Sequence, residues 1–222
     1  MCASIIEETI PNIIKTINLA KKEKPNYLEI RLDKLKDITP IKTEQLLKTI
    51  TNETKIPLII TNRIKKEGGY NTQSEKERIK ILETSIPYAK LVDIEYQTPK
   101  EYQEKITKNI ETIVSFHDFQ KTPPKQELTK IIKESKKIGT IPKIATTPHT
   151  IKDTITTLEL IEENKDIIAI SMTEMGKYTR IIGPILGSYL TYAAVNKETA
   201  PGQLTIKETR NLIEKLGNIN DT

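Results

Sequence analysis

The stretch TIVSFHDFQKTPPKQELTKIIKESKKIGTIPKIAT, residues 112–146, decides the fold class of this chain. It opens with an apolar run at 112–117 and closes with another at 141–146, and the Ile and Val residues in these runs favour strands. Between the runs, Leu128, Ile131 and Ile132 recur at helical spacing. A strand, a helix and a second strand in this order are typical of a βαβ unit with parallel strands.

The same alternation continues in both directions along the chain. Further Ile- and Val-rich runs predict strands at 2–6, 27–32, 56–62, 90–96 and 166–172. We expect a short eighth strand at 198–203. The runs are almost continuously apolar, as in parallel strands covered on both faces. No linker or low-complexity tract interrupts the pattern, so we expect one domain over residues 1–222.

Capping signals indicate where several helices begin. Ser74 followed by Glu77 matches the capping box, in which a hydroxyl and a carboxylate each accept from the other residue's backbone N–H. A second box begins at Thr205. Thr39 and Thr98 each precede a proline, which is favoured in the first helical turn, so each threonine is predicted to be an N-cap.

Two architectures fit this order of elements, the open doubly wound sheet and the closed eightfold barrel. The open sheet usually carries a glycine-rich phosphate-binding turn after its first strand, and residues 4–9 contain no glycine. We therefore expect an α/β protein with a single-domain (β/α)8 TIM barrel. In such a barrel the active site lies at the carboxyl ends of the strands.

Charge and cysteine content limit the possible functions. Lys+Arg 35 against Asp+Glu 30 give a net charge of +5, but the lysines are dispersed and no basic run is interleaved with aromatic residues. We therefore expect no nucleic-acid binding. Cys2 is the single cysteine, which rules out an intrachain disulfide and fits a reducing cytoplasm. The longest apolar-leaning run, residues 181–195, is shorter than the ~20 residues that span a bilayer, so we expect no membrane association.

Two residues at predicted strand ends suggest chemistry. Lys143 lies inside the run IPKIATTP, where burial disfavours the charged ammonium form and would leave an amine able to attack a carbonyl. An edge lysine that reaches water is the alternative. His117 follows the apolar run IVSF and suits a proton shuttle, although a structural histidine is also possible. His149 is the only other histidine, and no cluster has metal-ligand spacing, so we expect no metal site.

Further polar residues follow the other predicted strands: Glu29, Arg31, Arg63, Glu67 and Arg180. A barrel would bring them together with Lys143 and His117 at one mouth. Arginines are rare in this lysine-rich chain, and a planar guanidinium holds both oxygens of a carboxylate. We therefore expect a small anionic substrate.

Taken together, these residues resemble the type I 3-dehydroquinate dehydratases. The matching motifs are ExRxD at 29–33, RxxxEGG at 63–69, SFHDF at 115–119, PKIA at 142–145, MGKYTR at 175–180 and APGQ at 200–203. The resemblance covers essentially the whole chain. It implies a TIM barrel that dehydrates 3-dehydroquinate to 3-dehydroshikimate, the third step of the shikimate pathway of aromatic amino-acid biosynthesis.

The resemblance also implies roles for particular residues. Lys143 matches the imine-forming lysine, His117 the general acid/base, and Glu67 the carboxylate that positions the histidine. Because the protonated imine is the electron sink, no cofactor is implied. Arg180 matches the arginine that binds the substrate carboxylate. The residues that match those binding the ring hydroxyls and neighbouring groups are Glu29, Arg31, Arg63 and Gln203. Thr199 stands where the family often has serine, and a homodimer is expected because family members are commonly dimers.

Two alternatives stay open. A lysine-imine aldolase on the same barrel would also use Lys143 but would need a glycine-rich phosphate site after the last two strands, for which residues 200–203 are poorly suited. A basic nucleic-acid-binding domain would show steep salt dependence.

Overall fold

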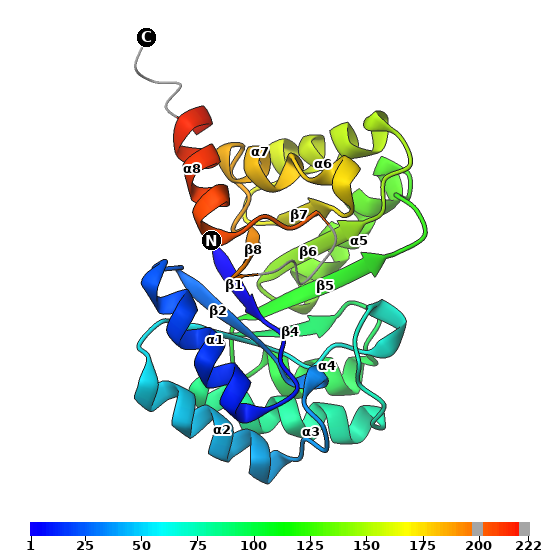
Figure 1. The fold of residues 1–222 in the computed structure, drawn as a ribbon. Coiled ribbons are helices and arrows are strands. Elements are labelled where there is room, and N and C mark those ends of the chain that lie inside the picture. Colours follow the sequence, from blue (N-terminus) through cyan, green and yellow to red (C-terminus); the bar gives the residue numbers. More distant parts are fainter. Residues whose placement is uncertain (197–201, 218–222) are drawn as a thin grey trace.

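The computed structural model describes residues 1–196 and 202–217. Within these ranges, strands and helices alternate along the chain (Figure 1). The strands are β1 Cys2–Ile5, β2 Tyr27–Arg31, β3 Leu58–Thr61, β4 Leu91–Glu95, β5 Thr112–Asp118, β6 Ile141–Thr146, β7 Ile168–Ser171 and β8 Tyr192–Ala194. The α-helices are α1 Ile10–Lys22, α2 Pro40–Glu53, α3 Glu75–Ser85, α4 Lys100–Thr107, α5 Lys125–Ile138, α6 Ile151–Glu163, α7 Thr179–Ile185 and α8 Ile206–Gly217. The 3-10 helices are η1 Leu32–Lys34, η2 Lys65–Glu67, η3 Ile86–Tyr88 and η4 Glu174–Gly176.

The strands form one sheet in the order β7-β6-β5-β4-β3-β2-β1-β8, and every strand pairing is parallel. Tyr189, just before β8, donates its backbone N–H to the Ile167 carbonyl, just before β7, at 2.8 Å, which joins the two ends of the sheet. Helices α1–α4 cover one half of the sheet and α5–α8 the other (Figure 1). The expected (β/α)8 TIM barrel is confirmed. No helix in the described ranges is long and apolar enough to cross a bilayer.

The eighth strand differs from its predicted position. It is formed by Tyr192–Ala194 instead of 198–203, and residues 198–201 of that prediction lie outside the described residues. Alanine has a low strand propensity, so the pattern of this segment gave little sign of a strand. Pairing with β1 decides the outcome: Cys2 lies opposite Tyr192, and the Cys2 N–H donates to the Thr191 carbonyl at 2.8 Å.

Most of the predicted helix starts are confirmed. Ser74 and Thr205 each begin a reciprocal capping box, and Thr39 caps α2 by accepting from the Lys42 N–H. Thr98 does not cap α4, which begins after Pro99 without a side-chain cap. Its hydroxyl oxygen instead accepts a hydrogen bond from the buried guanidinium of Arg78 at 3.0 Å.

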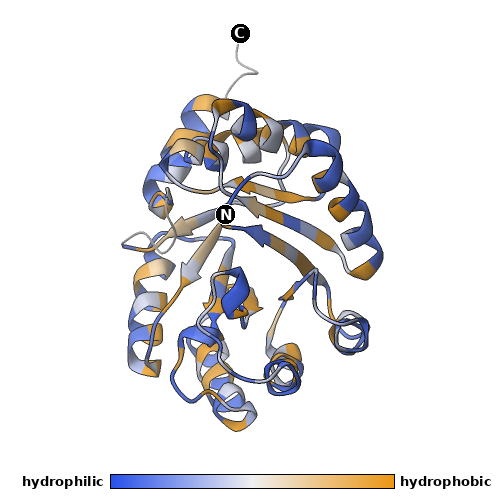
Figure 2. Ribbon diagram, turned by 90° about the vertical axis from the view of Figure 1, so that its right-hand side faces the viewer, coloured by the Kyte–Doolittle hydropathy of each residue, from blue (hydrophilic) through white to orange (hydrophobic). Residues whose placement is uncertain are grey.

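The inside of the barrel changes from apolar to polar along the strands. Near the amino ends, the inward residues pack in one cluster: Cys2, Tyr27, Ile59, Leu91, Ile113, Ile141 and Ile168. Two positions further along each of the first six strands, the residues are polar: Ser4, Glu29, Thr61, Asp93, Ser115 and Lys143. Alternate residues pack outward against the helices, whose ribbons show hydrophobic and hydrophilic segments in turn (Figure 2). The apolar end fills the barrel, and the polar end is left to form a site.

Candidate active site

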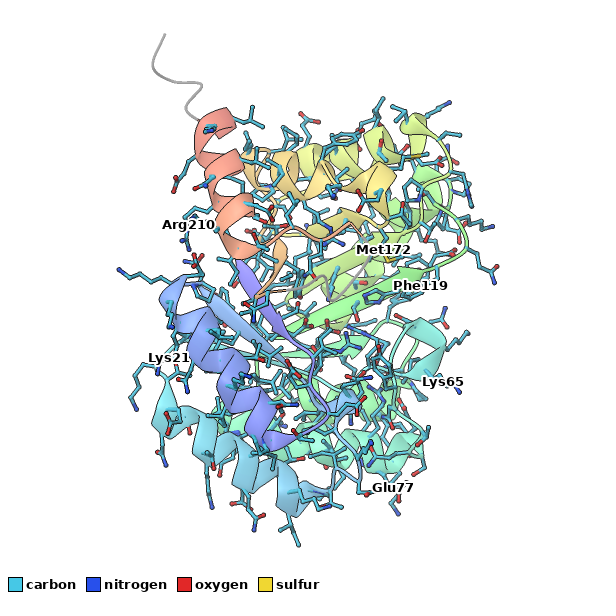
Figure 3. The ribbon with its side chains drawn as sticks, viewed as in Figure 1. Lys21, Lys65, Glu77, Phe119, Met172 and Arg210 are labelled. Atoms are coloured by element: carbon cyan, nitrogen blue, oxygen red, sulfur yellow. The ribbon has the colours of Figure 1, made fainter. Side chains whose placement is uncertain are left out.

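A pocket of about 270 Å³ opens at the carboxyl ends of the strands. Every predicted site residue that the structure describes lines it: Glu29, Arg31, Arg63, Glu67, His117, Lys143, Arg180 and Gln203. Phe119 and Met172, which also line it, lie on the side of the barrel away from Lys21 and Arg210 (Figure 3). Thr199 lies outside the described residues. The convergence predicted from the strand ends is therefore present.

Lys143 points into this pocket from the middle of β6 and is 5% exposed. Its Nζ lies 3.0 Å from Oδ2 of Asp93 on β4 and 3.1 Å from the hydroxyl of Tyr192 on β8. The burial expected from the sequence is observed. The adjacent carboxylate was not foreseen from the sequence.

Asp93 also binds Arg63, so the lysine belongs to a network of buried charges. Arg63 Nη2 lies 2.8 Å from Asp93 Oδ1, and Nη1 lies 3.0 Å from Glu95 Oε1 and donates to Ser115 Oγ. Burial raises the pKa of the Asp93 carboxyl, but the charges of Arg63 and Lys143 outweigh it and hold that pKa well below its ordinary value. Asp93 is therefore ionised at neutral pH.

The network continues beneath the pocket to the surface of α3. Glu95 Oε2 accepts from Nη1 of Arg78 at 2.7 Å, and the same guanidinium forms a two-bond pair with Glu75 at 2.7 and 2.8 Å. Arg78 is only 1% exposed. The Arg63 guanidinium is thus bound by two carboxylates of the protein.

His117 and Glu67 form a second pair on the wall of the pocket. His117 Nδ1 lies 2.9 Å from Glu67 Oε2, and the His117 backbone N–H donates to the same oxygen at 3.1 Å. Burial, together with the charges of Arg63 and Lys143, lowers the pKa of His117 well below 6.5. Burial also raises the pKa of Glu67 to about 7. The imidazole is thus neutral at pH 7, and an ionised Glu67 would hold the proton on Nδ1 and leave Nε2 free to accept another.

Glu29 and Arg31 occupy inward positions of β2. Glu29 accepts from the hydroxyls of Ser4 at 3.0 Å and Thr61 at 2.8 Å, which fixes the carboxylate in the pocket wall. Arg31 forms a two-bond pair with Asp33 through Nε at 2.9 Å and Nη2 at 2.8 Å. Both side chains are therefore held by hydrogen bonds within the protein.

Arg180 and Gln203 also line the pocket. Arg180 lies on α7 and Gln203 follows β8, and they are 4% and 3% exposed. A buried guanidinium at the wall of a small pocket is suited to an anionic ligand.

The loop after β3 is shaped by its two glycines. Gly68 has φ +78°, in the left-handed region, and a Cβ there would lie 2.3 Å from the ring of Phe119. A Cβ on Gly69 would lie 2.0 Å from the carbonyl oxygen of Arg63. This close packing brings Glu67 to His117.

Among the pocket and network residues that were not assigned a role from the sequence are Asp93, Glu95, Ser115 and Tyr192. A signal for three of them was present. Asp93 and Glu95 follow Leu91 at every second position, and Ser115 precedes His117 by two, so all share the inward face. Within the described ranges, no group of three or more His, Cys, Asp and Glu side chains is arranged to hold a metal ion.

These features define a class of protein: a (β/α)8-barrel enzyme with a buried lysine and a histidine–carboxylate pair in one pocket. The model of the type I 3-dehydroquinase family matches residues 1–220. The chain belongs to this family, as the sequence motifs indicated, and is a hydro-lyase. Neither the aldolase nor the nucleic-acid alternative is retained.

Relatives and solved structures agree with this assignment. The chain is 36% identical over 217 residues to the 3-dehydroquinate dehydratase of Methanothermobacter thermautotrophicus, covering 97% of this chain and 96% of that protein. It is 37% identical over 227 residues to the enzyme of that name from Methanococcus maripaludis, covering 98% and 100%. The crystal structure of the type I 3-dehydroquinate dehydratase from Clostridium difficile, with covalently modified comenic acid, aligns with a TM-score of 0.92 and 29% identity, over 99% of this chain and 92% of that one.

Proposed function

We propose that this enzyme converts 3-dehydroquinate to 3-dehydroshikimate through an imine on Lys143, in the third step of the shikimate pathway. Family membership supports the overall dehydration. The observation that carries the imine mechanism is the Lys143 amine, buried at the base of the same pocket that His117 lines. The Clostridium difficile structure, with its covalently modified ligand, is consistent with covalent chemistry in this family.

The Lys143 ammonium first gives up one proton, and the resulting amine attacks the ring ketone. The carbonyl oxygen receives that proton and a second one from Nζ and leaves as water, so that a protonated imine joins Nζ to the ring carbon. This cation withdraws electrons and acidifies the adjacent C–H bond, so no cofactor is required for carbanion formation. Asp93 lies 3.0 Å from Nζ and stabilises the positive charge that remains there.

His117 then moves the proton. Its free Nε2 removes the proton alpha to the iminium carbon while Glu67 holds the Nδ1 side. The electrons of that C–H bond form the ring double bond, and the beta hydroxyl takes a proton from the imidazolium and leaves as water. Hydrolysis of the imine consumes one water and releases the product. The net change is the loss of one water from the substrate.

Substrate recognition follows from the charges in the pocket. Arg180 would bind the substrate carboxylate through its planar guanidinium. Glu29, Arg31 and Gln203 line the pocket at positions suited to ring hydroxyls, and Arg63 acts there chiefly through Asp93 and Glu95. Thr199 would add a hydroxyl group that can bind the substrate.

Borohydride reduction in the presence of 3-dehydroquinate, followed by peptide mass spectrometry, tests the mechanism. A reduced adduct is expected on Lys143 and should be absent in Lys143→Ala. Lys90→Ala is the matched control, because Lys90 is exposed before β4 at the other end of the barrel. Dehydration by the wild type without an adduct on Lys143 would contradict the imine.

We further propose that the enzyme acts in the cytoplasm as a homodimer. A single buried cysteine fits a reducing compartment, and dimers are common in the family that the sequence resembles. Light scattering coupled to size-exclusion chromatography tests the assembly: a mass near twice 25.3 kDa is expected, and a mass near 25.3 kDa would contradict it.

A further inference from the structure

Arg78 does not line the pocket, yet it is 1% exposed and its guanidinium reaches Glu95, the last residue of β4. The guanidinium makes five hydrogen bonds: two to the Glu75 carboxylate and one each to the Asn62 carbonyl, the Glu95 carboxylate and the Thr98 hydroxyl. A guanidinium has five N–H donors, so every one of them has an acceptor. The side chain is therefore bound by the protein on all sides.

Glu95 connects Arg78 to the pocket. Its Oε2 accepts from Arg78 Nη1 at 2.7 Å, and its Oε1 accepts from Arg63 Nη1 at 3.0 Å. Oε1 also accepts from the backbone N–H of Ile64 at 3.1 Å, at the start of the loop that carries Glu67. Because both oxygens have donors and the side chain is 1% exposed, the plane of the Glu95 carboxylate is fixed from two sides.

The same contacts continue to the reactive amine. Arg63 Nη2 lies 2.8 Å from Asp93 Oδ1, and Asp93 Oδ2 lies 3.0 Å from Lys143 Nζ. A row of charges that alternate in sign thus leads from α3 into the pocket: Glu75, Arg78, Glu95, Arg63, Asp93 and Lys143. A buried charge without a partner is costly, so the loss of one member forces its neighbours to rearrange.

We propose that Arg78 is a positioning residue, which keeps this row of charges in the arrangement that places the Lys143 amine for attack on the substrate ketone. Without the guanidinium, Glu95 Oε2 lacks its donor, and Arg63, which is already bound to Glu95, turns to supply one. Arg63 Nη2 then withdraws from Asp93, and the carboxylate that holds Nζ is displaced. This inference rests on the proposed imine mechanism and gives a residue outside the pocket a part in it.

The test is the steady-state dehydration of 3-dehydroquinate by Arg78→Met, which keeps an unbranched side chain but removes the charge. We expect kcat to fall by about 10²-fold, the effect of misplacing a reacting group by about 1 Å, and KM to change little, because Arg78 does not line the pocket. Arg78→Lys keeps the charge but not the planar fork, and kcat should fall about tenfold. Circular dichroism checks the fold of each variant. A wild-type kcat in either folded variant would overturn the proposal.

Thr98→Val is the matched control. It removes another hydrogen bond of Arg78, of 3.0 Å, with almost no change of side-chain shape, and this bond is not on the path from Arg78 to Asp93. Urea unfolding should show a loss of stability, whereas kcat should stay at the wild-type value. If Thr98→Val lowers kcat as much as Arg78→Met, the effect is a general disturbance of α3 and the positioning role is refuted.

A double-mutant cycle on kcat with Glu95→Gln tests the path itself. If Arg78 acts through Glu95, the double variant should be no slower than the slower of the two single variants, because both changes break the same row of charges. Losses that multiply would show that Arg78 acts by another route. Borohydride trapping on the wild type separates the two proposals: without an adduct on Lys143 both fail, whereas an adduct together with an unchanged kcat in folded Arg78→Met overturns only the role of Arg78.

Discussion

Replacing Glu67 with glutamine should stabilise the protein at neutral and alkaline pH while it impairs catalysis. Glu67 is 5% exposed, and burial raises its pKa from 4.5 to about 7. Below pH 4.5 the carboxyl is protonated in both the folded and unfolded states. Between 4.5 and about 7 the unfolded state loses its proton and the folded state keeps it, so folding stability falls as the pH rises. Glutamine does not titrate and avoids this loss.

The size of the effect follows from the pKa. The rise of the Glu67 pKa from 4.5 to about 7 corresponds to about 3 kcal/mol in the free energy of unfolding. The wild type loses this stability once the pH exceeds about 7. His117 has a lowered pKa, so it makes the protein more stable as the pH rises towards 6.5, in the opposite direction. Because wild type and variant both contain His117, the difference between them at each pH isolates Glu67 to first order.

Urea unfolding of the wild type and Glu67→Gln at about pH 5 and about pH 9 measures this difference. The variant should gain about 2 kcal/mol or more relative to wild type between the two conditions. Glu77→Gln is the control: hydrogen bonds from Ser74 hold the Glu77 pKa below 4.5, so the carboxyl is already ionised over this range and the difference should stay constant. A constant difference for Glu67→Gln would refute the raised pKa.

Three further changes address other parts of the site. Asp93→Asn removes the charge that Arg63 and Lys143 share, and urea unfolding should show a loss of about 3 kcal/mol; an unchanged stability would mean that the ion pairs contribute nothing. Gly69→Ala would place a Cβ 2.0 Å from the Arg63 carbonyl oxygen, so the loop must shift and kcat should fall by about 10²-fold; wild-type kinetics would contradict this close approach. Arg180→Lys keeps the charge but loses the planar fork, and KM should rise about tenfold; an unchanged KM would count against a two-bond contact.

Much of the fold could be predicted because buried strands appear in the sequence as runs of apolar residues. Seven strands lie where Ile- and Val-rich runs predicted them, and β6 matches its predicted run, 141–146, at both ends. β8 was missed because Ala193 and Ala194 carry no strand preference, and its position depends on pairing with β1, which is remote in sequence. Thr98 was misassigned for a similar reason, since its partner Arg78 lies on another element.

The site was predictable to the extent that polar residues stand out at the ends of apolar runs. Lys143, His117 and Glu67 could be found in this way, and all three line the pocket. Their ion-pair and hydrogen-bond partners could not be assigned, because the sequence does not show which charged side chains lie next to each other in the fold. Arg63 shows the difference: as an isolated arginine it suggested a substrate contact, whereas the structure gives its guanidinium two protein carboxylates.

The burial of so many charges can be explained by the alternation of the strands. Period-two spacing sends every second residue into the barrel, and beyond the apolar layer those positions hold Asp93, Glu95, Arg63 and Lys143. A lone buried charge would be costly, but here each has a partner of opposite sign within 3.0 Å. The pairing holds Lys143 Nζ between the ionised Asp93 carboxylate and the Tyr192 phenol, so the geometry of the candidate site is a consequence of how the charges are neutralised in the fold.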